Sequence, residues 1–447
     1  MDKQSLLKGN IKKQLIGLAI PLLMGNVLQQ FYHTVDAMII GRFLGVDAFA
    51  AAGIAGTIMN LFIFVLDGFC MGISVIFGML YGEGDQRKFR QQVFVSLSLG
   101  SILTAGVCLV CFTVLKPFIR LIQTPKHLEG AMVSYLSIII VGMIFTYLYN
   151  LFAGILRSIG DTKAALGVLF LAVLLNGLLD YCFVVIFRMG IQGAAYATVL
   201  AQSVAAACCY GYLRKYYREW MCSRQDIGIH RELVKKTVRF GCASALQESN
   251  LYIGKILVQG AVNTLGTAGI AAYTAATRLE GFANSFGDSG AVAVSIFISQ
   301  NYGARDEKRV ADGRAHGLKL LAGFGIALSV LMFALAPWGM DIFLSQKDSL
   351  TMEYGTAYLR IVAVFYVLNF IGNSFVGYFR GTGRVHNPVI GTTINISTRV
   401  VLSYLLVGKL GLAAIAVATG IGWIGVVSYL AITYWRIHAA YPQAVGQ

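Results

Sequence analysis

Two stretches of this chain, 221 residues apart, are copies of one another, and both lie within long apolar runs. Leu44-Gly45 is repeated by Leu265-Gly266, and Tyr81-Gly82 by Tyr302-Gly303. Near the end of each half the offset becomes 223, where Gly154-Ile155-Leu156-Arg157 is matched by Gly377-Tyr378-Phe379-Arg380. A repeat of more than two hundred residues is far longer than a solenoid unit of about 20–50 residues. The chain is therefore expected to fold as two homologous bundles.

The apolar runs are long enough to be transmembrane helices. The chain is 57% hydrophobic and 13% charged, with a mean hydropathy of +0.69. A bilayer core needs roughly 20 apolar residues per helix, and the pattern is helical rather than the alternation of a β-barrel. Twelve stretches, six in each half, meet this need: 14–42, 48–80, 93–115, 130–156, 164–187, 191–213, 237–264, 267–301, 317–345, 354–379, 386–408 and 411–436.

Basic residues predict the topology. Of 36 Lys and Arg residues, 25 fall on the side of the expected membrane that holds both termini, and 7 fall on the other side. This bias predicts cytoplasmic termini. It also accounts for most of the net charge of +15, which indicates contact with anionic membrane lipids rather than with nucleic acid. The first apolar run is too long for a cleavable signal peptide. We expect a multi-pass protein of the cell membrane, in a bacterium the inner or cytoplasmic membrane.

The repeat and the charges together predict the domain organisation. We expect an amino-terminal six-helix lobe over 1–213, a cytoplasmic linker over 214–236 and a carboxy-terminal six-helix lobe over 237–447. The linker is interpreted as a solvated, lipid-facing tether, with binding of a regulator as the alternative. The eight cysteines lack metal-type spacing and are interpreted as small apolar side chains.

Ionisable side chains within the apolar runs are the expected functional residues, because a charge in hydrocarbon costs several kcal/mol unless it has a partner or a water-filled cavity. The acids in such positions are Asp36, Asp67, Asp180, Glu248, Glu280 and Asp288. The roles of Asp67, Glu280 and Asp288 stay open, although Asp67 and Asp288 occupy equivalent places in the repeat.

Two helices carry a polar pair at a spacing of four residues, which places both members on one helix face. The pairs are Tyr32 with Asp36, and Asn176 with Asp180; Thr198 lies in the next helix. Their oxygens suit Na⁺, or alternatively form a hydrogen-bonded cage of acids that exchange protons. A purely structural role, joining helices by hydrogen bonds, is the other interpretation.

One proline is expected to let a transmembrane helix bend. Pro21 lies inside the helix over 14–42 and permits a bend there.

The order of these features resembles the multidrug and toxic compound extrusion (MATE) family over essentially the whole chain. The features are Ile20-Pro21, Val35-Asp36, Leu44-Gly45, Tyr81-Gly82, Leu156-Arg157-Ser158-Ile159-Gly160-Asp161, Asn176 with Asp180, Tyr302-Gly303 and Phe379-Arg380-Gly381-Thr382-Gly383. The resemblance implies an all-α membrane protein of twelve transmembrane helices in two pseudo-symmetric six-helix bundles, arranged in a V. It also implies a secondary active transporter that exports hydrophobic, often cationic drugs or xenobiotics in exchange for H⁺ or Na⁺ by alternating access.

The resemblance implies particular sites as well. Asp36, Asn176, Asp180 and Thr198, with Tyr32 beside them, match the coupling-ion residues of the branch whose cation site lies in the first lobe. Another branch combines acids on two helices of the second lobe. Glu248 matches the first of these acids, but the second stretch, 365–369, has no carboxylate. Glu248 is therefore expected in substrate recognition or as a second proton site, and Asn150 at the substrate cleft.

The alternatives to an exporter are a flippase and an enzyme. A flippase for a lipid-linked cell-wall or oligosaccharide precursor is the alternative. An enzyme is not expected, because motifs such as HExxH, GxSxG and the Walker sequence are absent. We expect no cofactor beyond the coupling ion, drug-like small molecules as substrates, and a monomer.

Overall fold

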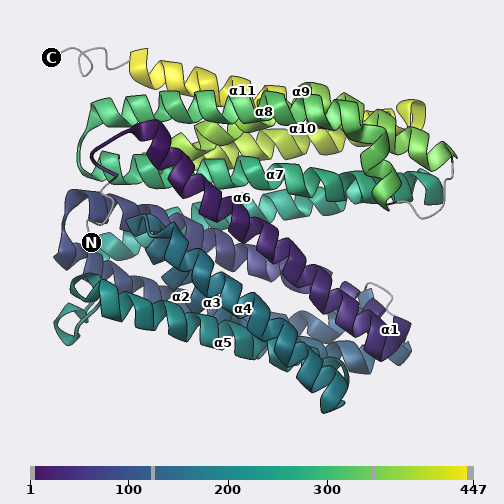
Figure 1. Ribbon diagram of the computed structural model, residues 1–447, viewed down its shortest axis with the longest axis horizontal. Helices are drawn as coiled ribbons and strands as arrows, with labels where there is room; N and C mark the ends of the chain where they lie inside the picture. The colour runs from purple at the N-terminus through teal and green to yellow at the C-terminus, as the bar shows by residue number, and fades with distance from the viewer. Residues whose placement is uncertain (1–5, 122–125, 344–348, 440–447) are drawn as a thin grey trace. The chain divides into compact units, whose positions relative to one another are not determined.

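The apolar runs fold as long helices in the computed structural model, which describes residues 6–121, 126–343 and 349–439 (Figure 1). No strand occurs within these ranges. The long helices are α1 (Ile11–Glu83), α2 (Gln86–Leu121), α3 (Lys126–Ile159), α4 (Thr162–Asp180), α5 (Gly190–Tyr216), α6 (Arg231–Asn263), α7 (Gly266–Gly303), α8 (Glu307–Phe343), α9 (Ser349–Gly381), α10 (His386–Leu410) and α11 (Leu412–Ala439). Three short turns join them, a π-helix η1 (Tyr181–Ile186) and the 3₁₀ turns η2 (Arg218–Trp220) and η3 (Arg224–Asp226).

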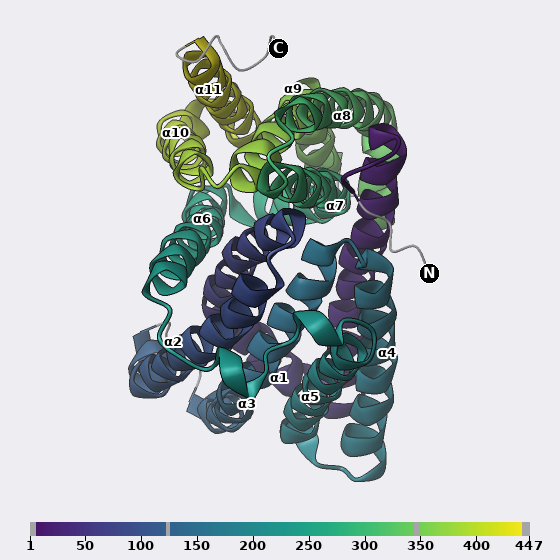
Figure 2. The same ribbon diagram turned by 90° about the vertical axis from the view of Figure 1, so that its left-hand side faces the viewer.

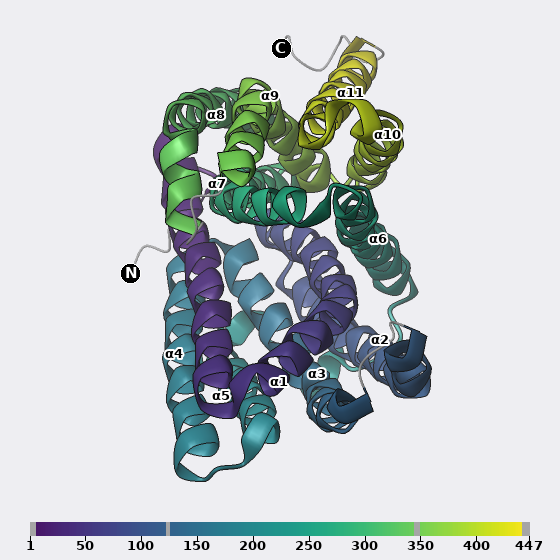
Figure 3. The ribbon, with the colours of Figure 1, turned by 90° about the vertical axis from the view of Figure 1, so that its right-hand side faces the viewer.

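The first helix is two membrane-length helices joined at Gly45. This residue has φ +85° and ψ −177°, outside the helical range, which glycine adopts without the clash that a Cβ would cause. Figure 3 shows the chain reversing direction along α1. Counting α1 as two, the described residues contain the twelve long helices that the sequence predicts.

Ten of these helices are long and apolar enough to cross a membrane within the described chain. The other two are α6 and α7, and both carry charges along their length. α6 contains Glu248 and Lys255, and α7 contains Arg278, Glu280 and Asp288. The all-helical membrane fold is confirmed, whereas the orientation of the termini stays a prediction.

Backbone geometry repeats with the sequence. Gly45 and Gly266 both adopt positive φ (85° and 69°), as do Gly160 and Gly383 (100° and 74°). Where Gly84 has φ 75°, the second copy places Arg305 at φ 60°. The next residue caps the following helix in both copies, because Asp85 accepts from the Lys88 amide and Asp306 from the Arg309 amide, each at 2.9 Å. The repeat thus extends to the turns that end and begin helices.

Packing divides the chain into two compact units. The amino-terminal unit is Met24–Ala245, and the carboxy-terminal unit is Met1–Leu23 with Leu246–Gln447. This division differs from the predicted lobes at two places. In the carboxy-terminal unit, Arg309 donates to the Leu6 and Gly9 carbonyls, which holds the start of the chain there. In the amino-terminal unit, Gly72 lies against the Phe240 backbone, nine residues after the first residue of α6. The homologous-lobe boundaries at 213 and 237 stay a prediction.

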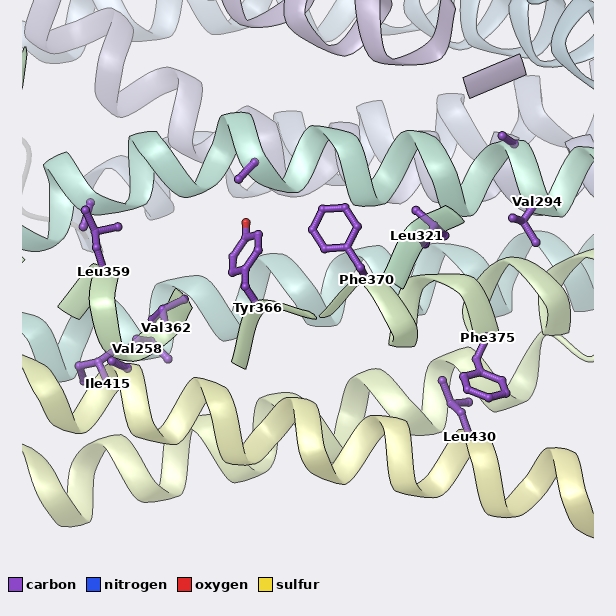
Figure 4. Packing of buried hydrophobic residues seen from close by; sticks show 14 of the residues in the cluster. Val258, Val294, Leu321, Leu359, Val362, Tyr366, Phe370, Phe375, Ile415 and Leu430 are labelled. Atoms are coloured by element: carbon purple, nitrogen blue, oxygen red, sulfur yellow. The ribbon is translucent and has the colours of Figure 1, made fainter. Parts of the chain in front are cut away.

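Each unit has an apolar core of its own. In the amino-terminal unit α3 packs against α2 and α5, and α4 packs against α5 (Figure 2). In the carboxy-terminal unit α9 is the central helix, since it packs against α7, α8 and α11. Tyr366 and Phe370 of α9 are fully buried in this core (Figure 4).

Candidate functional site

The predicted coupling residues come together in the amino-terminal unit, from helices α1, α4 and α5. The Tyr32 hydroxyl on α1 donates a hydrogen bond to Thr198 Oγ1 on α5 at 3.3 Å, across 166 residues of sequence. The negative charge of Asp36 acts on the Asp180 carboxyl, and both acids act on the Tyr32 phenol. The side chains of three helices therefore face one another.

The carboxylates of this group have no counterion among the residues that the structure describes. Asp180 is fully buried, and Asn176 is 1% exposed. Neither Asp180 oxygen accepts a hydrogen bond from the described residues, nor does Asp36 Oδ1, and the Asn176 Nδ2 has no acceptor there. No Lys or Arg of the described chain is within ion-pair distance of either acid. Because an uncompensated charge in a membrane is costly, this arrangement of acids can take up a cation.

The donor set indicates what kind of cation. Two carboxylates, an amide and two hydroxyls are hard oxygen ligands. No group of three or more His, Cys, Asp and Glu side chains that could hold a metal ion occurs in the described ranges. The set fits a small exchangeable ion, H⁺ or Na⁺, rather than a resident transition metal.

The backbone at Asp180 is irregular. α4 ends at Asp180 and continues directly as the π-helix η1. A π-turn is rare and interrupts the regular hydrogen bonds of a helix, and such turns recur at functional sites. Asn176 and Asp180 keep their i,i+4 relation because both precede this change. The π-helix could not be predicted from the sequence, since its residues, Tyr181–Ile186, continue the apolar run.

One further side chain, Tyr135 on α3, lies near these residues and was not predicted. The charges of Asp36 and Asp180 and the Tyr32 phenol all act on its hydroxyl. In the sequence it is one aromatic residue among many in an apolar run, which carries no signal for an ion site.

The sequence predicts a bend at Pro21, but the backbone there is helical. Pro21 is buried within α1, and the only non-helical backbone inside α1 is at Gly45. Pro21 lies two residues before Leu23, where the chain passes from one compact unit to the other. Its role as a hinge stays a prediction.

Glu248 has a partner that the sequence analysis missed. Its Oε1 is 3.0 Å from Arg380 Nη2, with side-chain exposures of 15% and 7%. Arg380 lies on α9. This helix also contains 365–369, the stretch that has no carboxylate to match the second acid of the other branch. The ion pair gives Glu248 a fixed countercharge, and its expected part in substrate recognition or proton binding stays a prediction.

Two other acids of the carboxy-terminal unit, the buried Glu280 and the exposed Asp288, also lie near cations. Arg399 and Lys255 act on Glu280, and the Arg399 guanidinium also donates to the Tyr273 hydroxyl at 3.2 Å. Arg380 and Lys255 act on Asp288, which also accepts a hydrogen bond from Asn373. Cations therefore lie near both acids, but neither acid is within ion-pair distance of a Lys or Arg of the described chain, and Glu280 Oε1 has no hydrogen-bond partner there.

Asn150 and Asp67 form a separate contact in the amino-terminal unit. Asn150 Nδ2 donates to Asp67 Oδ1 at 2.6 Å. The amide therefore satisfies one oxygen of an acid that the sequence placed in an equivalent position to Asp288. A place for Asn150 at the substrate cleft stays a prediction.

Known proteins resemble the chain in sequence and in fold. The MatE family model matches residues 21–182 and 243–405. The probable multidrug resistance protein YpnP of Bacillus subtilis is 28% identical over 400 residues, which cover 89% of this chain and 88% of that protein. The probable multidrug resistance protein NorM of Thermotoga maritima is 26% identical over 441 residues, covering 94% and 89%. A solved structure described as the outward-facing conformation of a multidrug resistance MATE family transporter has the same fold, with a TM-score of 0.90, 23% identity and 99% of each chain covered.

Proposed function

The chain belongs to the MatE family of multidrug efflux transporters, and on this premise we propose that it exports hydrophobic, often cationic drugs in exchange for H⁺ or Na⁺. Export proceeds by alternating access, and the coupling ion binds at Asp36, Asn176, Asp180 and Thr198, with Tyr32 beside them. The observation that supports this most is the pair of acids, Asp36 and Asp180, whose oxygens lack partners in the described chain.

The chemistry of the pair explains how an ion can drive transport. Two carboxylates that interact in a medium of low dielectric constant repel one another, and a shared H⁺ or Na⁺ removes that repulsion. The ion can shift the protein toward the drug-releasing conformation only if that conformation binds the ion more tightly. Thr198 and Tyr32 come from different helices, so a change in helix positions would alter the ion's ligands.

The surrounding residues hold this site in place without supplying charge. Asn176 shares the α4 face of Asp180 and is 1% exposed, so its amide has little access to water. Tyr32 links α1 to α5 through Thr198. These neutral groups leave the charge of the acids to be balanced by the transported ion.

Efflux from proteoliposomes tests the proposal. The purified chain is reconstituted, a fluorescent hydrophobic cation is loaded, and a pH gradient and a Na⁺ gradient are imposed separately. We expect at least one gradient to drive the cation uphill, and the effective gradient identifies the ion. Absence of uphill transport with either gradient, in vesicles shown to be sealed, would refute an ion-coupled exporter.

The flippase alternative is not favoured, because the curated relatives reported above are described as multidrug resistance proteins. We also propose cytoplasmic termini, a monomer and a place in the bacterial inner membrane. A reporter fused at residue 225 should then give a cytoplasmic signal, and an extracellular signal there would overturn the topology.

A further inference from the structure

The segment between α5 and α6 is folded rather than a loose tether. The Trp220 ring packs against Tyr81 and Phe89, with ring centroids 4.7 Å and 5.0 Å away. The Tyr217 hydroxyl donates to Asp161 Oδ2 at 3.0 Å. Figure 2 shows this segment in teal as short turns in front of α5. Its shape is therefore fixed by contacts within the amino-terminal unit.

A buried acid completes this fold. Arg90 Nε on α2 donates to both oxygens of Asp226, at 3.3 Å and 3.1 Å, and Arg90 Nη1 donates to the Glu219 carbonyl at 3.2 Å. Ser223 donates to Asp226 through its amide and its hydroxyl. The ion pair between Arg90 and Asp226 therefore balances both charges and holds the segment against α2.

The folded segment encloses one side of a basic cavity of about 690 Å³. Four arginines line it, and Glu219 is the only carboxylate among its lining residues. Arg90 is already paired with Asp226, whereas Arg214, Arg218 and Arg224 are exposed and have no ion-pair partner in the described chain. Three guanidinium groups are therefore available to a ligand.

The lining also includes apolar side chains, and two of them belong to membrane helices. Phe94 belongs to α2 and Tyr210 to α5, both membrane-length helices. Tyr210 and Ile227 are 42% and 60% exposed. An arginine cluster beside exposed apolar side chains at the end of membrane helices is suited to an amphiphile with an anionic head.

We propose that this cavity binds an anionic phospholipid, with the head-group phosphate among Arg214, Arg218 and Arg224 and the acyl chains beside Tyr210 and Phe94. A guanidinium matches the oxygens of a phosphate with two parallel hydrogen bonds. The volume is within the range of small-molecule sites, about 300–1,000 Å³. The inference is independent of the coupling ion and of the exported substrate.

Native mass spectrometry with defined lipids tests the site. The full-length protein is titrated with phosphatidylglycerol, with phosphatidylcholine and with glycerol 3-phosphate. We expect retention of phosphatidylglycerol, and roughly tenfold weaker binding in the variant Arg214→Gln/Arg218→Gln/Arg224→Gln. The matched control Arg87→Gln/Lys163→Gln/Lys235→Gln removes the same charge from exposed positions outside the cavity and should bind nearly as the parent does.

The other outcomes each overturn the proposal. Equal weakening in the control would mean general attraction to a basic surface. Equal retention of phosphatidylcholine would remove the role of the anionic charge. Displacement of the lipid by glycerol 3-phosphate at similar concentration would identify a soluble phosphate as the occupant.

A second measurement needs no variant. Hydrogen exchange of residues 218–227 in the parent protein should slow in nanodiscs that contain phosphatidylglycerol, relative to phosphatidylcholine alone. Identical exchange in both membranes would refute lipid binding at this segment.

Discussion

In the amino-terminal unit, Asp36 and Asp180 lie near one another without a basic partner in the described chain. In the carboxy-terminal unit, Glu248 pairs with Arg380 at 3.0 Å, and Arg399 faces Glu280. The two units share a repeat and similar backbone turns, yet among the described residues only the carboxy-terminal unit pairs one of its intramembrane acids, Glu248, with a basic side chain within ion-pair distance. An acid with a fixed countercharge has little need of a transported ion, whereas a pair without one can gain much from it.

The largest effect is expected from the acids without countercharges. Asp36→Asn and Asp180→Asn should each reduce ion-driven efflux to the background of empty vesicles, because each removes a charge that the coupling ion neutralises. Since the two act in one site, the double variant should be little worse than either single one. Uphill efflux in proteoliposomes is the measurement.

An exposed acid of the same unit provides the control. Glu83 lies at the end of α1 with a 42% exposed side chain, so Glu83→Gln should transport as the parent does. If both Asp variants still pump drug uphill, coupling lies elsewhere, and the contrast between the units would have no functional meaning.

The second effect is on stability. Glu248→Gln leaves the Arg380 guanidinium buried without its partner, and breaking a buried ion pair costs about 3–5 kcal/mol. Thermal unfolding of the purified protein should show this loss. The double variant Glu248→Gln/Arg380→Gln should recover most of it, because no unpaired charge remains.

The same variant separates a structural role from a role in recognition. If Glu248→Gln is as stable as the parent but transports a different set of cations, then Glu248 contacts substrate, as the sequence analysis predicted. In that case the Glu248–Arg380 ion pair would not be a structural difference between the carboxy-terminal and amino-terminal units.

Much of this comparison could be predicted from the sequence. The repeat indicated two bundles of six helices. Because a charge in an apolar run needs a partner or a cavity, the sequence also indicated six acids of interest, Asp36 and Asp180 among them. The four-residue spacings placed Tyr32 with Asp36 and Asn176 with Asp180. The convergence of their three helices came from the family resemblance, since spacing alone cannot bring distant helices together.

The partners were harder to predict. Arg380 stands near a turn, where an arginine usually indicates a cytoplasmic loop, so nothing marked it as the partner of Glu248, 132 residues away. The Arg90–Asp226 pair likewise spans 136 residues. The boundary after Leu23 falls inside a continuous helix, and helical periodicity does not show which neighbours a helix packs against.

A smaller effect concerns a compensated acid outside the membrane. Burial alone raises the pKa of the Asp226 carboxyl, but hydrogen bonds from Ser223 and the Arg90 guanidinium outweigh it, and the pKa lies below the usual range. A lowered folded pKa adds stability at neutral pH, and this stability is lost as the pH falls through the lowered pKa. Hydrogen exchange of residues 218–227 should therefore accelerate in acid.

Asp226→Asn should remove this pH dependence and weaken the local fold by about 2 kcal/mol at neutral pH, as expected for hydrogen bonds to a charged group. Glu219→Gln is the control, since its carboxylate makes a long contact of 3.5 Å with Gln86. An acid response that persists in Asp226→Asn would assign it to another group.

The smallest effect tests the neutral part of the ion site. The Tyr32 hydroxyl donates to Thr198 at 3.3 Å, a long hydrogen bond whose net contribution is about 0.5–1.5 kcal/mol. Tyr32→Phe should therefore weaken the apparent affinity for the coupling ion by roughly two- to tenfold, while efflux at saturating ion is largely kept. The dependence of efflux on pH or Na⁺ concentration measures the shift.

Tyr181→Phe is the matched control, because that phenol makes no hydrogen bond within the described chain and is 50% exposed. If Tyr32→Phe abolishes transport as the Asp variants do, Tyr32 takes part in the ion site as directly as the carboxylates, and charge is not what sets the first unit apart.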